Sequence, residues 1–286
     1  MLTPMGSAIS HLKDSSIEHF AFQAPSTNQT KKTPGVRLLR CRKGSQIAIS
    51  FTPAPDSSNT LDKYDDIAPL VLFSHGNAVD IASTVEYCKW FSQQFECNVL
   101  TYDYINYGMS SQGCTTEENI KEAIDRVYDF VKNNLCATKI FLVGKSIGTA
   151  PTTYLASSRV DYLGVILISP LSSGVRCLSI SRFFPSILLH KLDGVFCPLL
   201  QLMPKIYKPT LMIHGNQDNV VPVQCTNDLY DALPRENKNF LPVFLGNKYR
   251  PCSHNNIETD FEKTFCDNVM SFMKVVLEDL DMDVPL

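Results

Sequence analysis

The chain has 286 residues, of which 44% are hydrophobic and 19% are charged. This length and composition are ordinary for a globular protein with one large domain or two small ones. The formal net charge of -3, with both signs spread along the chain, argues against nucleic acid as an obligatory partner. No apolar run reaches the roughly 18 unbroken residues that a membrane-spanning helix needs.

The ten cysteines form no C-x-x-C pair, and most of them lie inside apolar runs. We therefore expect buried, reduced cysteines, no metal site and no cofactor. Residues 1–16 lack the apolar core of a secretory signal, which predicts a cytoplasmic protein.

The pattern of apolar segments predicts an α/β fold in one domain over residues 36–286, after an irregular polar arm over residues 1–35. Eight strands are expected, in chain order at "VRLLRC", "QIAISFTP", "PLVLFS", "CNVLTYD", "KIFLVG", "LGVILIS", "PTLMIHG" and "FLPVFLG". Helical patterns cover 80–95, 117–134, 146–159, 223–233 and 256–280. Strands that alternate with helices predict a mostly parallel sheet with helices on both faces.

One connection departs from this alternation. Residues 175–208 join two predicted strands through an apolar segment that prolines interrupt. A long insertion of this kind in a βα fold is typical of a cap over the functional site. Two interpretations stay open, a cap that shapes an acyl pocket and a lid that packs on the core.

Residues 139–149, "KIFLVGKSIGT", match parts of two motifs. Gly144-Lys145-Ser146 matches the end of a phosphate-binding loop, which requires its first glycine at position 139. That position is Lys139, and the "IFLV" that follows has the apolar character of a buried strand. The phosphate-binding interpretation is therefore excluded.

The same stretch contains the G-x-S-x-G of a nucleophile elbow, in which a serine occupies a sharp turn between a strand and a helix. Gly144 and Gly148 would allow the strand and the helix to approach closely. Ser146 would lie at a helix N-terminus, where backbone N–H groups favour negative charge. Ser146 is therefore the candidate nucleophile, while Lys145 is left either facing solvent or lining the mouth of the site.

Chain order identifies candidate partners for Ser146, because in this fold the acid and then the histidine follow the nucleophile. Asp218 follows the predicted strand "PTLMIHG", and His254 lies in the loop after the last predicted strand. His190 falls in the predicted cap and His214 ends a strand, so neither is the candidate base. An ordinary turn aspartate and a surface histidine are the structural alternatives for Asp218 and His254.

Acyl transfer also needs two donors for the oxyanion of the tetrahedral intermediate. The backbone N–H of Ile147, next to the nucleophile, is the first candidate. The loop "SHGNAVD" supplies the second, for which we select the N–H of Asn77, with Ala78 as the alternative. His75 in this loop is expected to be structural. Together these residues predict attack on an acyl carbonyl, followed by hydrolysis of the acyl-enzyme.

With these residues placed, the chain resembles the alpha/beta hydrolase domain-containing protein seventeen family over about residues 17–280. The resemblance rests on "LFSHGNAVD", "TYDYINYGMSS", "GKSIGT", "ISPLSSGVR", "PTLMIHGNQDNVV" and "SHN". It implies an α/β-hydrolase fold with Ser146, Asp218 and His254 as nucleophile, acid and base. It also implies removal of palmitate from S-acylated proteins, and hence contact with the cytosolic face of membranes.

The chain departs from the family pattern at two places near the expected site. The family has a glycine within "DYSGYG", where this chain has Ile105-Asn106 in "DYINYG". The family's short "GAGHN" is here the longer "GNKYRPCSHN", which leaves the approach of His254 open.

The N-terminus differs too. The first cysteine is Cys41, whereas animal members of the family have an N-terminal cysteine cluster that is palmitoylated. Residues 5–10, "MGSAIS", match the N-myristoylation pattern if translation begins at Met5, which would place the lipid on Gly6. A single myristoyl chain binds membranes only weakly, and Lys13, Lys31 and Lys32 would be a thin second signal.

Two further function classes stay open beside a palmitoyl-protein thioesterase. The first is a monoacylglycerol-type lipase or esterase, or a serine peptidase. A peptidase is the weaker of these because Asp193 is the only acidic residue between 175 and 208 to bind a substrate N-terminus. The second class is a non-catalytic binding protein that has kept the fold.

Overall fold

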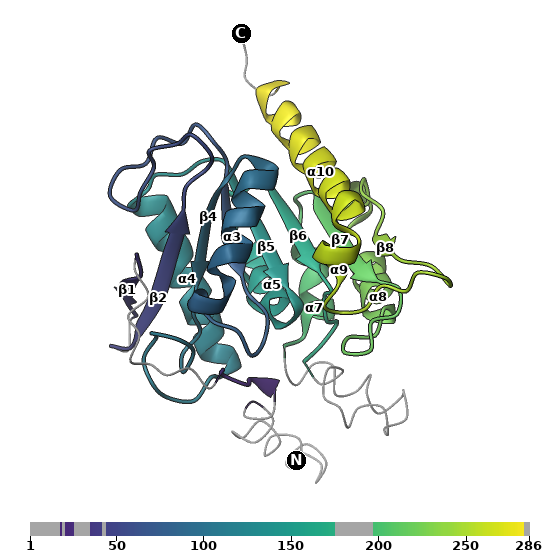
Figure 1. Cartoon of the computed structure of the whole chain (residues 1–286), viewed down its shortest axis with the longest axis horizontal. Helices are drawn as coiled ribbons and strands as arrows, with labels where there is room; N and C mark the ends of the chain where they lie inside the picture. Colours follow the sequence, from purple (N-terminus) through teal and green to yellow (C-terminus); the bar gives the residue numbers. More distant parts are fainter. Residues whose placement is uncertain (1–17, 19–20, 26–34, 42–43, 175–196, 283–286) are drawn as a thin grey trace, which may run out of the picture.

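The computed structural model describes residues 18, 21–25, 35–41, 44–174 and 197–282 (Figure 1). The predicted cap is therefore described only from residue 197 onward, and the myristoylation pattern at Gly6 lies outside the described residues. In the part of the chain that is described, no helix combines the length and the apolar character needed to cross a bilayer.

An eight-stranded sheet runs through the centre of the molecule (Figure 1). Its strands are β1 (Arg37–Arg40), β2 (Gln46–Thr52), β3 (Leu70–Ser74), β4 (Asn98–Tyr102), β5 (Ile140–Lys145), β6 (Gly164–Ile168), β7 (Thr210–Gly215) and β8 (Val243–Leu245). Their spatial order is β1-β2-β4-β3-β5-β6-β7-β8. The pairs β1–β2 and β2–β4 are antiparallel, and all pairs from β4 to β8 are parallel. The predicted mostly parallel sheet is confirmed.

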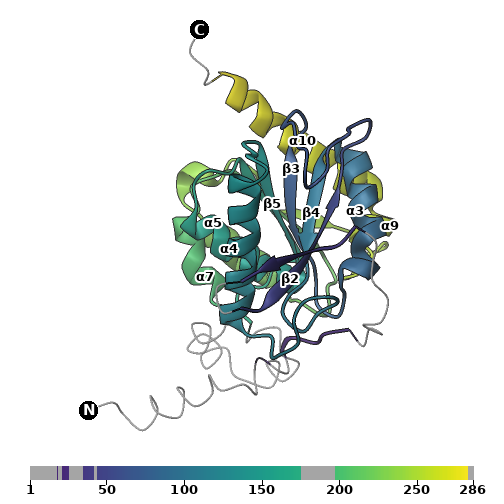
Figure 2. The ribbon, with the colours of Figure 1, turned by 90° about the vertical axis from the view of Figure 1, so that its left-hand side faces the viewer.

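Helices cover both faces of this sheet, as Figure 2 shows from the side. One face carries α4 (Glu117–Asn133), α5 (Thr149–Ser158), α7 (Leu199–Leu202) and α8 (Gln224–Ala232), and the other carries α3 (Ile81–Phe95) and α10 (Glu262–Met282). Neighbouring strand residues alternate between these two cores because successive side chains point to opposite faces. Leu72 of β3 packs in the first core, whereas Val71 and Phe73 pack in the second.

Side-chain caps fix where two of the helices begin. The carboxylate of Asp80 accepts a hydrogen bond from the Ser83 N–H at the start of α3, and the hydroxyl of Thr116 does the same for Asn119 at the start of α4. Such reciprocal caps satisfy N–H groups that the first turn of a helix leaves free. The helix predicted over 256–280 is instead two helices, α9 (Ile257–Asp260) and α10, separated by Phe261.

The described end of the predicted cap belongs to the core. Leu199 of α7 and Met203 of the short helix η4 (Met203–Lys205) are buried, and both helices contact α5. Residues 197–205 therefore pack on the helix that follows the candidate nucleophile. The remainder of the predicted cap, 175–196, lies outside the described residues.

All nine cysteines in the described part of the chain are free thiols. Cys114 and Cys136 are exposed, and the other seven are buried. Burial raises the pKa of the Cys88 thiol to about 12 and moves that of Cys97 further in the same direction. These buried thiols stay protonated at neutral pH, which suppresses their reactivity.

Candidate active site

The strand order places the loop after β3 next to the turn after β5. Strands β3 and β5 are hydrogen-bonded neighbours, and Ser74 at the end of β3 pairs with Gly144 near the end of β5. Parallel strands end at the same edge of a sheet, and ligands bind there at the point where the strand order reverses. The loop after β3 therefore lies next to the turn that contains Ser146.

The turn after β5 has the geometry of a nucleophile elbow. Ser146 has a φ of 54°, in the left-handed region that non-glycine residues rarely adopt, and it opens the short helix η1 (Ser146–Gly148) that leads into α5. A Cβ on Gly148 would lie 2.1 Å from the Ser74 carbonyl oxygen, and one on Gly144 would lie 2.6 Å from Thr152 Oγ1. Close packing therefore requires glycine at both positions. The sequence predicted close contact between the strand and the helix of the elbow, whereas Gly148 packs against the neighbouring strand β3.

Asp218 lies in the loop after β7; its side chain is fully buried and both carboxylate oxygens are occupied. Its Oδ1 accepts the Val220 and Val221 N–H groups, each at 2.8 Å. Its Oδ2 lies 2.6 Å from His254 Nδ1 and 3.2 Å from His214 Nε2. Burial alone would raise the Asp218 pKa, but the hydrogen bonds from the two histidines and the backbone outweigh burial and lower it.

His214, which the sequence placed only at the end of a strand, supports Asp218. The Thr226 hydroxyl lies 2.6 Å from its Nδ1, and Nε2 faces the Val221 carbonyl oxygen at 3.1 Å as well as Asp218. Both neighbours of Nε2 are acceptors, so Nε2 carries the proton and Nδ1 accepts from Thr226. This arrangement fixes the imidazole as a donor to Asp218.

The loop that carries His254 is longer than in the resembled family, yet it returns to the site. Its additional residues close a local turn, in which Asn247 N–H donates to the Arg250 carbonyl at 2.8 Å. Beyond that turn, Cys252 N–H donates to Asn216 Oδ1 at 3.0 Å, and Gln217 N–H donates to the Cys252 carbonyl at 2.8 Å. These bonds join the loop after β8 to the loop after β7, so the residues before His254 are fixed beside Asp218.

His254 bridges the other two candidate residues. Its Nδ1 lies 2.6 Å from Asp218 Oδ2 and its Nε2 lies 3.0 Å from Ser146 Oγ. Because ionised Asp218 can only accept, Nδ1 carries the proton and Nε2 presents a lone pair to the Ser146 hydroxyl. The imidazole is largely buried, with 7% of its residue surface exposed. The structure therefore brings Ser146, Asp218 and His254 together from three loops.

The candidate oxyanion loop follows β3 directly. A Cβ on Gly76 would lie 3.8 Å from Ser146 Cβ, so this loop passes directly over the elbow. The N–H of Ala78 donates to the Gln23 carbonyl at 3.0 Å and is occupied. The N–H of Asn77 has no hydrogen-bond partner among the residues that the structure describes. Ile147 lies in the first turn after Ser146, where N–H groups lack partners within the helix.

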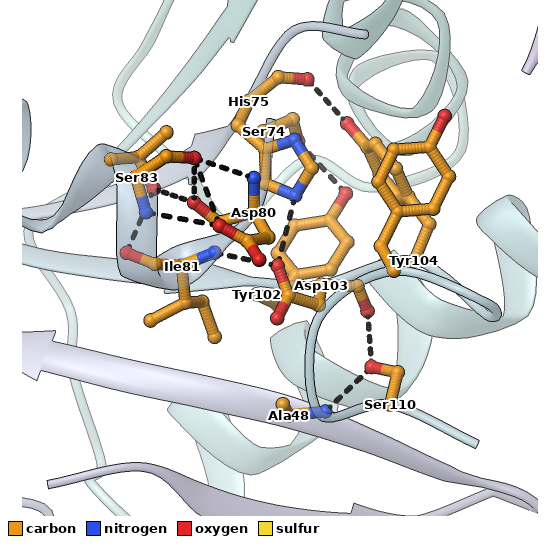
Figure 3. Close-up of polar contacts among 12 residues, drawn as sticks. Ala48, Ser74, His75, Asp80, Ile81, Ser83, Tyr102, Asp103, Tyr104 and Ser110 are labelled. Carbon is orange, nitrogen blue, oxygen red and sulfur yellow. Dashed lines mark hydrogen bonds and ion pairs between the residues drawn. The ribbon is translucent and has the colours of Figure 1, made fainter. Parts of the chain in front are cut away.

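A buried polar network holds the base of this loop (Figure 3). Tyr104 donates its hydroxyl to the His75 carbonyl at 2.7 Å, and the two rings pack with centroids 4.5 Å apart. His75 Nε2 lies 3.3 Å from Asp103 Oδ1 but forms no hydrogen bond with it, and Asp103 Oδ1 accepts the Ile81 N–H. The expected structural role of His75 agrees with these contacts.

In the altered "DYINYG", Asn106 has a φ of 71°, which asparagine tolerates better than most residues.

Lys145, left open by the sequence, forms an ion pair. Its Nζ lies 2.7 Å from Glu258 Oε1 and 5.4 Å from the centre of the Tyr87 ring. The Tyr87 hydroxyl donates to the same carboxylate oxygen at 3.2 Å. The pair links the residue before Ser146 to the residue four positions after His254.

Sequence reasoning did not identify several residues that support this site. Glu258 and Tyr87 carried no signal, because each contacts a partner that is distant in sequence. His214 lies only four residues before Asp218, but its contact depends on how the loop between them folds. Ala21 and Gln23 were assigned to an irregular arm, although they contact the loop at Asn77. Within the described ranges, no group of histidine, cysteine or acidic residues has the arrangement of a metal site.

Comparison with known proteins identifies relatives along most of the chain. It is 30% identical over 254 residues to the alpha/beta hydrolase domain-containing protein aho-3 of Caenorhabditis elegans, covering 88% of this chain and 68% of that protein. It is 36% identical over 222 residues to protein 17C of Xenopus tropicalis, covering 76% and 66%, and 36% identical over 203 residues to human protein 17C, covering 70% and 56%. The chain thus spans less than two thirds of the human relative. No family model matches it.

Solved structures show the same fold at low sequence identity. The esterase Pf2001 of Pyrococcus furiosus superposes with a TM-score of 0.67 at 17% identity, covering 88% of this chain and 98% of that one. Est1E of Butyrivibrio proteoclasticus, solved with ferulic acid, gives a TM-score of 0.65 at 17% identity, covering 85% and 99%. On fold and sequence together, this chain belongs to the alpha/beta hydrolase domain-containing protein 17 family.

Proposed function

We propose that this chain is a serine hydrolase in which Ser146, His254 and Asp218 act as a catalytic triad. The observation that carries the proposal is the bridging imidazole, 2.6 Å from Asp218 and 3.0 Å from Ser146. The left-handed φ of Ser146 adds support, since strained backbone is typical of functional sites.

The geometry supports a two-step acyl transfer. His254 Nε2 takes the Ser146 proton while Oγ attacks the acyl carbonyl carbon, and Asp218 stabilises the imidazolium that forms. The oxyanion accepts hydrogen bonds from the Ile147 and Asn77 N–H groups. The intermediate then expels the alcohol or thiol, to which His254 returns the proton. Water then attacks the acyl-enzyme while the same imidazole takes its proton. The second intermediate releases the carboxylic acid as His254 returns that proton to Ser146 Oγ.

Within this class, we propose a long-chain acyl thioester as the substrate, of the kind found in palmitoylated proteins. Family membership and the apolar composition of the predicted cap support this choice. A protein thioesterase of this kind acts at the cytosolic face of a membrane, so we also propose peripheral membrane contact. Sedimentation of the chain with anionic lipid vesicles tests that contact directly.

Labelling by a fluorophosphonate probe tests the catalytic proposal. We expect the wild type to be labelled and Ser146→Ala to be unlabelled, with an unchanged thermal transition. Ser158→Ala is the matched control, because Ser158 is exposed at the far end of α5. Absence of labelling in folded wild-type protein would instead favour a non-catalytic binding protein.

Substrate preference is a separate measurement. Turnover of a palmitoyl thioester, a monoacylglycerol and an aminoacyl amide by the wild type distinguishes the three hydrolase types. We expect the thioester to give the highest kcat/KM, and dependence of that rate on Ser146 excludes a contaminating activity. Preference for either other substrate would move the assignment to a lipase or a peptidase.

A further inference from the structure

A short piece of the N-terminal arm is bound to the candidate oxyanion loop. Gln23 N–H donates to Asn77 Oδ1 at 2.9 Å, and Asn77 Nδ2 donates to the Ala21 carbonyl at 2.8 Å. The Ala78 N–H closes the contact by donating to the Gln23 carbonyl at 3.0 Å. Three hydrogen bonds thus join two residues of the arm to two consecutive residues of the loop, across more than 50 positions of sequence.

These contacts occupy the Asn77 side chain while they leave its backbone N–H without a partner in the described structure. The Tyr107 hydroxyl also donates to Asn77 Oδ1, at 2.7 Å, so the amide group is held by three partners. A side chain held in this way fixes the orientation of the peptide unit that bears it. The following residue, Ala78, has a φ of 57°, a conformation that persists only where neighbouring contacts impose it.

The arm is anchored within the contact, at Phe22, and before it, at Glu18. Phe22, between the two contacting residues, is 6% exposed and packs in the core that α4 also joins. Phe22 N–H donates to the Glu18 carbonyl, and Glu18 Oε1 accepts the Glu117 N–H at the start of α4, each at 2.8 Å. An anion at that helix end is favourable because the first-turn N–H groups are unsatisfied. The segment is therefore fixed relative to the sheet.

The interior network holds a different part of the loop. Tyr104 fixes the His75 carbonyl, one residue before Gly76 and two before Asn77. The arm, together with Tyr107, is what holds Asn77 and Ala78. The two sets of contacts thus divide the loop between them.

We propose that the segment Ala21–Gln23 positions the oxyanion hole, by holding the Asn77 peptide so that its N–H faces the developing oxyanion. This inference rests on the proposed function, since it takes Asn77 as an oxyanion donor. The arm contributes through its backbone groups and the Phe22 anchor, and the exposed Gln23 side chain takes no part.

Substitution at Gln23 isolates this contact. Gln23→Pro removes the N–H that donates to Asn77 Oδ1, whereas Gln23→Ala keeps the backbone and removes only an exposed side chain. Tyr107→Phe removes one donor to the same oxygen and keeps the ring. Loss of one oxyanion donor in other hydrolases lowers kcat by about 10²–10³. Misalignment retains part of the interaction, so we expect Gln23→Pro to lower kcat about tenfold to a hundredfold.

The following measurements distinguish a misplaced oxyanion donor from a general loss of structure. For Gln23→Pro we expect an unchanged KM, an unchanged pKa on the acidic limb of the rate profile, and weaker binding of a trifluoromethyl ketone in proportion to kcat. Hydrogen exchange of the backbone amides in residues 75–80 should accelerate. Gln23→Ala should match the wild type in all of these, and Tyr107→Phe should show the same changes as Gln23→Pro to a smaller degree.

The outcomes distinguish this inference from the proposed function. If Ser146→Ala retains the wild-type rate, the catalytic proposal fails and the inference falls with it. If activity depends on Ser146 but Gln23→Pro equals Gln23→Ala in kcat and in ketone affinity, the triad stands and the positioning role is refuted. If Gln23→Pro does not fold, Tyr107→Phe and Phe22→Ala carry the same test, and wild-type kcat and ketone affinity in both would overturn it.

Discussion

Replacing Lys145 by methionine should loosen the connection between the nucleophile elbow and the loop that carries His254. Lys145 precedes Ser146, and its partner Glu258 follows His254 by four residues. The 2.7 Å ion pair therefore fixes two backbone segments whose separation sets the contact between Oγ and Nε2. Methionine keeps most of the length of the side chain and removes the charge.

The burial of the two partners sets the expected magnitude. Breaking a fully buried ion pair costs about 3–5 kcal/mol, because one charge is left without a partner. An exposed pair contributes at most about 1 kcal/mol. The Lys145 side chain is 23% exposed and that of Glu258 is 8% exposed, so the pair lies between these limits. We expect Lys145→Met to lower the free energy of unfolding by about 2 kcal/mol.

The effect on catalysis should be moderate. A displacement of about 1 Å between reacting groups can cost about a hundredfold in rate. The hydrogen bonds between the loops after β7 and β8 remain in the variant and limit the movement. We therefore expect kcat for an activated ester to fall about tenfold, with KM unchanged.

Urea unfolding and ester hydrolysis measure both quantities across a double-mutant cycle with Glu258→Gln, which keeps an acceptor for the Tyr87 hydroxyl. Because neighbouring charges couple, the double variant should recover at least about 1 kcal/mol relative to the sum of the single variants. Lys89→Met breaks an exposed pair with Glu86 and is the matched control. Additive losses with an unchanged kcat would refute the idea that this pair connects the two loops.

Two further predictions concern the acid and the elbow. Hydrogen bonds from two histidines and the backbone lower the Asp218 pKa, so the stability from its ionised form is present above about pH 4 and is lost as the pH falls below that value. The free energy of unfolding should fall more steeply from pH 5 to pH 3 in the wild type than in Asp218→Asn, and equal slopes in urea titrations would contradict the assignment. Gly148→Ala places a methyl group 2.1 Å from the Ser74 carbonyl oxygen, so we expect a loss of about 3 kcal/mol and of probe labelling. Gly76→Ala, whose Cβ has only ordinary contacts at 3.8 Å, should keep its stability, which thermal unfolding of both variants will show.

Much of the fold could be predicted from the sequence because the strands are short apolar runs between helical patterns. "PLVLFS" and "KIFLVG" became β3 and β5, since strands buried on both faces carry few polar residues. The break at Phe261 was missed because the helical pattern continues across it. The order of the strands was also beyond prediction, since it depends on contacts between segments that are far apart in sequence.

The candidate triad could be predicted because the elbow motif is local and the chain order of the three residues can be read directly from the sequence. The supporting contacts could not be predicted, because the Lys145–Glu258 pair joins residues 113 positions apart and the Gln23–Asn77 bond joins residues 54 positions apart. For His254 the length of the preceding loop left its approach open, because the turn that absorbs the extra residues depends on one Asn247 side chain. Reasoning from patterns finds groups that carry chemistry more readily than the groups that orient them.

The buried cysteines have a practical consequence for assays of this chain. A thioesterase releases a free thiol from its substrate, and a disulfide reagent such as DTNB reports that thiol only if the protein does not consume the reagent itself. Attack on such a reagent requires a thiolate, and burial raises the pKa of Cys252 and Cys266 to about 11 and that of Cys88 to about 12. Among the described cysteines, Cys114 and Cys136 are exposed and would react. In the described part of the chain, these two thiols therefore set the background against which a DTNB assay of the proposed thioesterase activity is read at neutral pH.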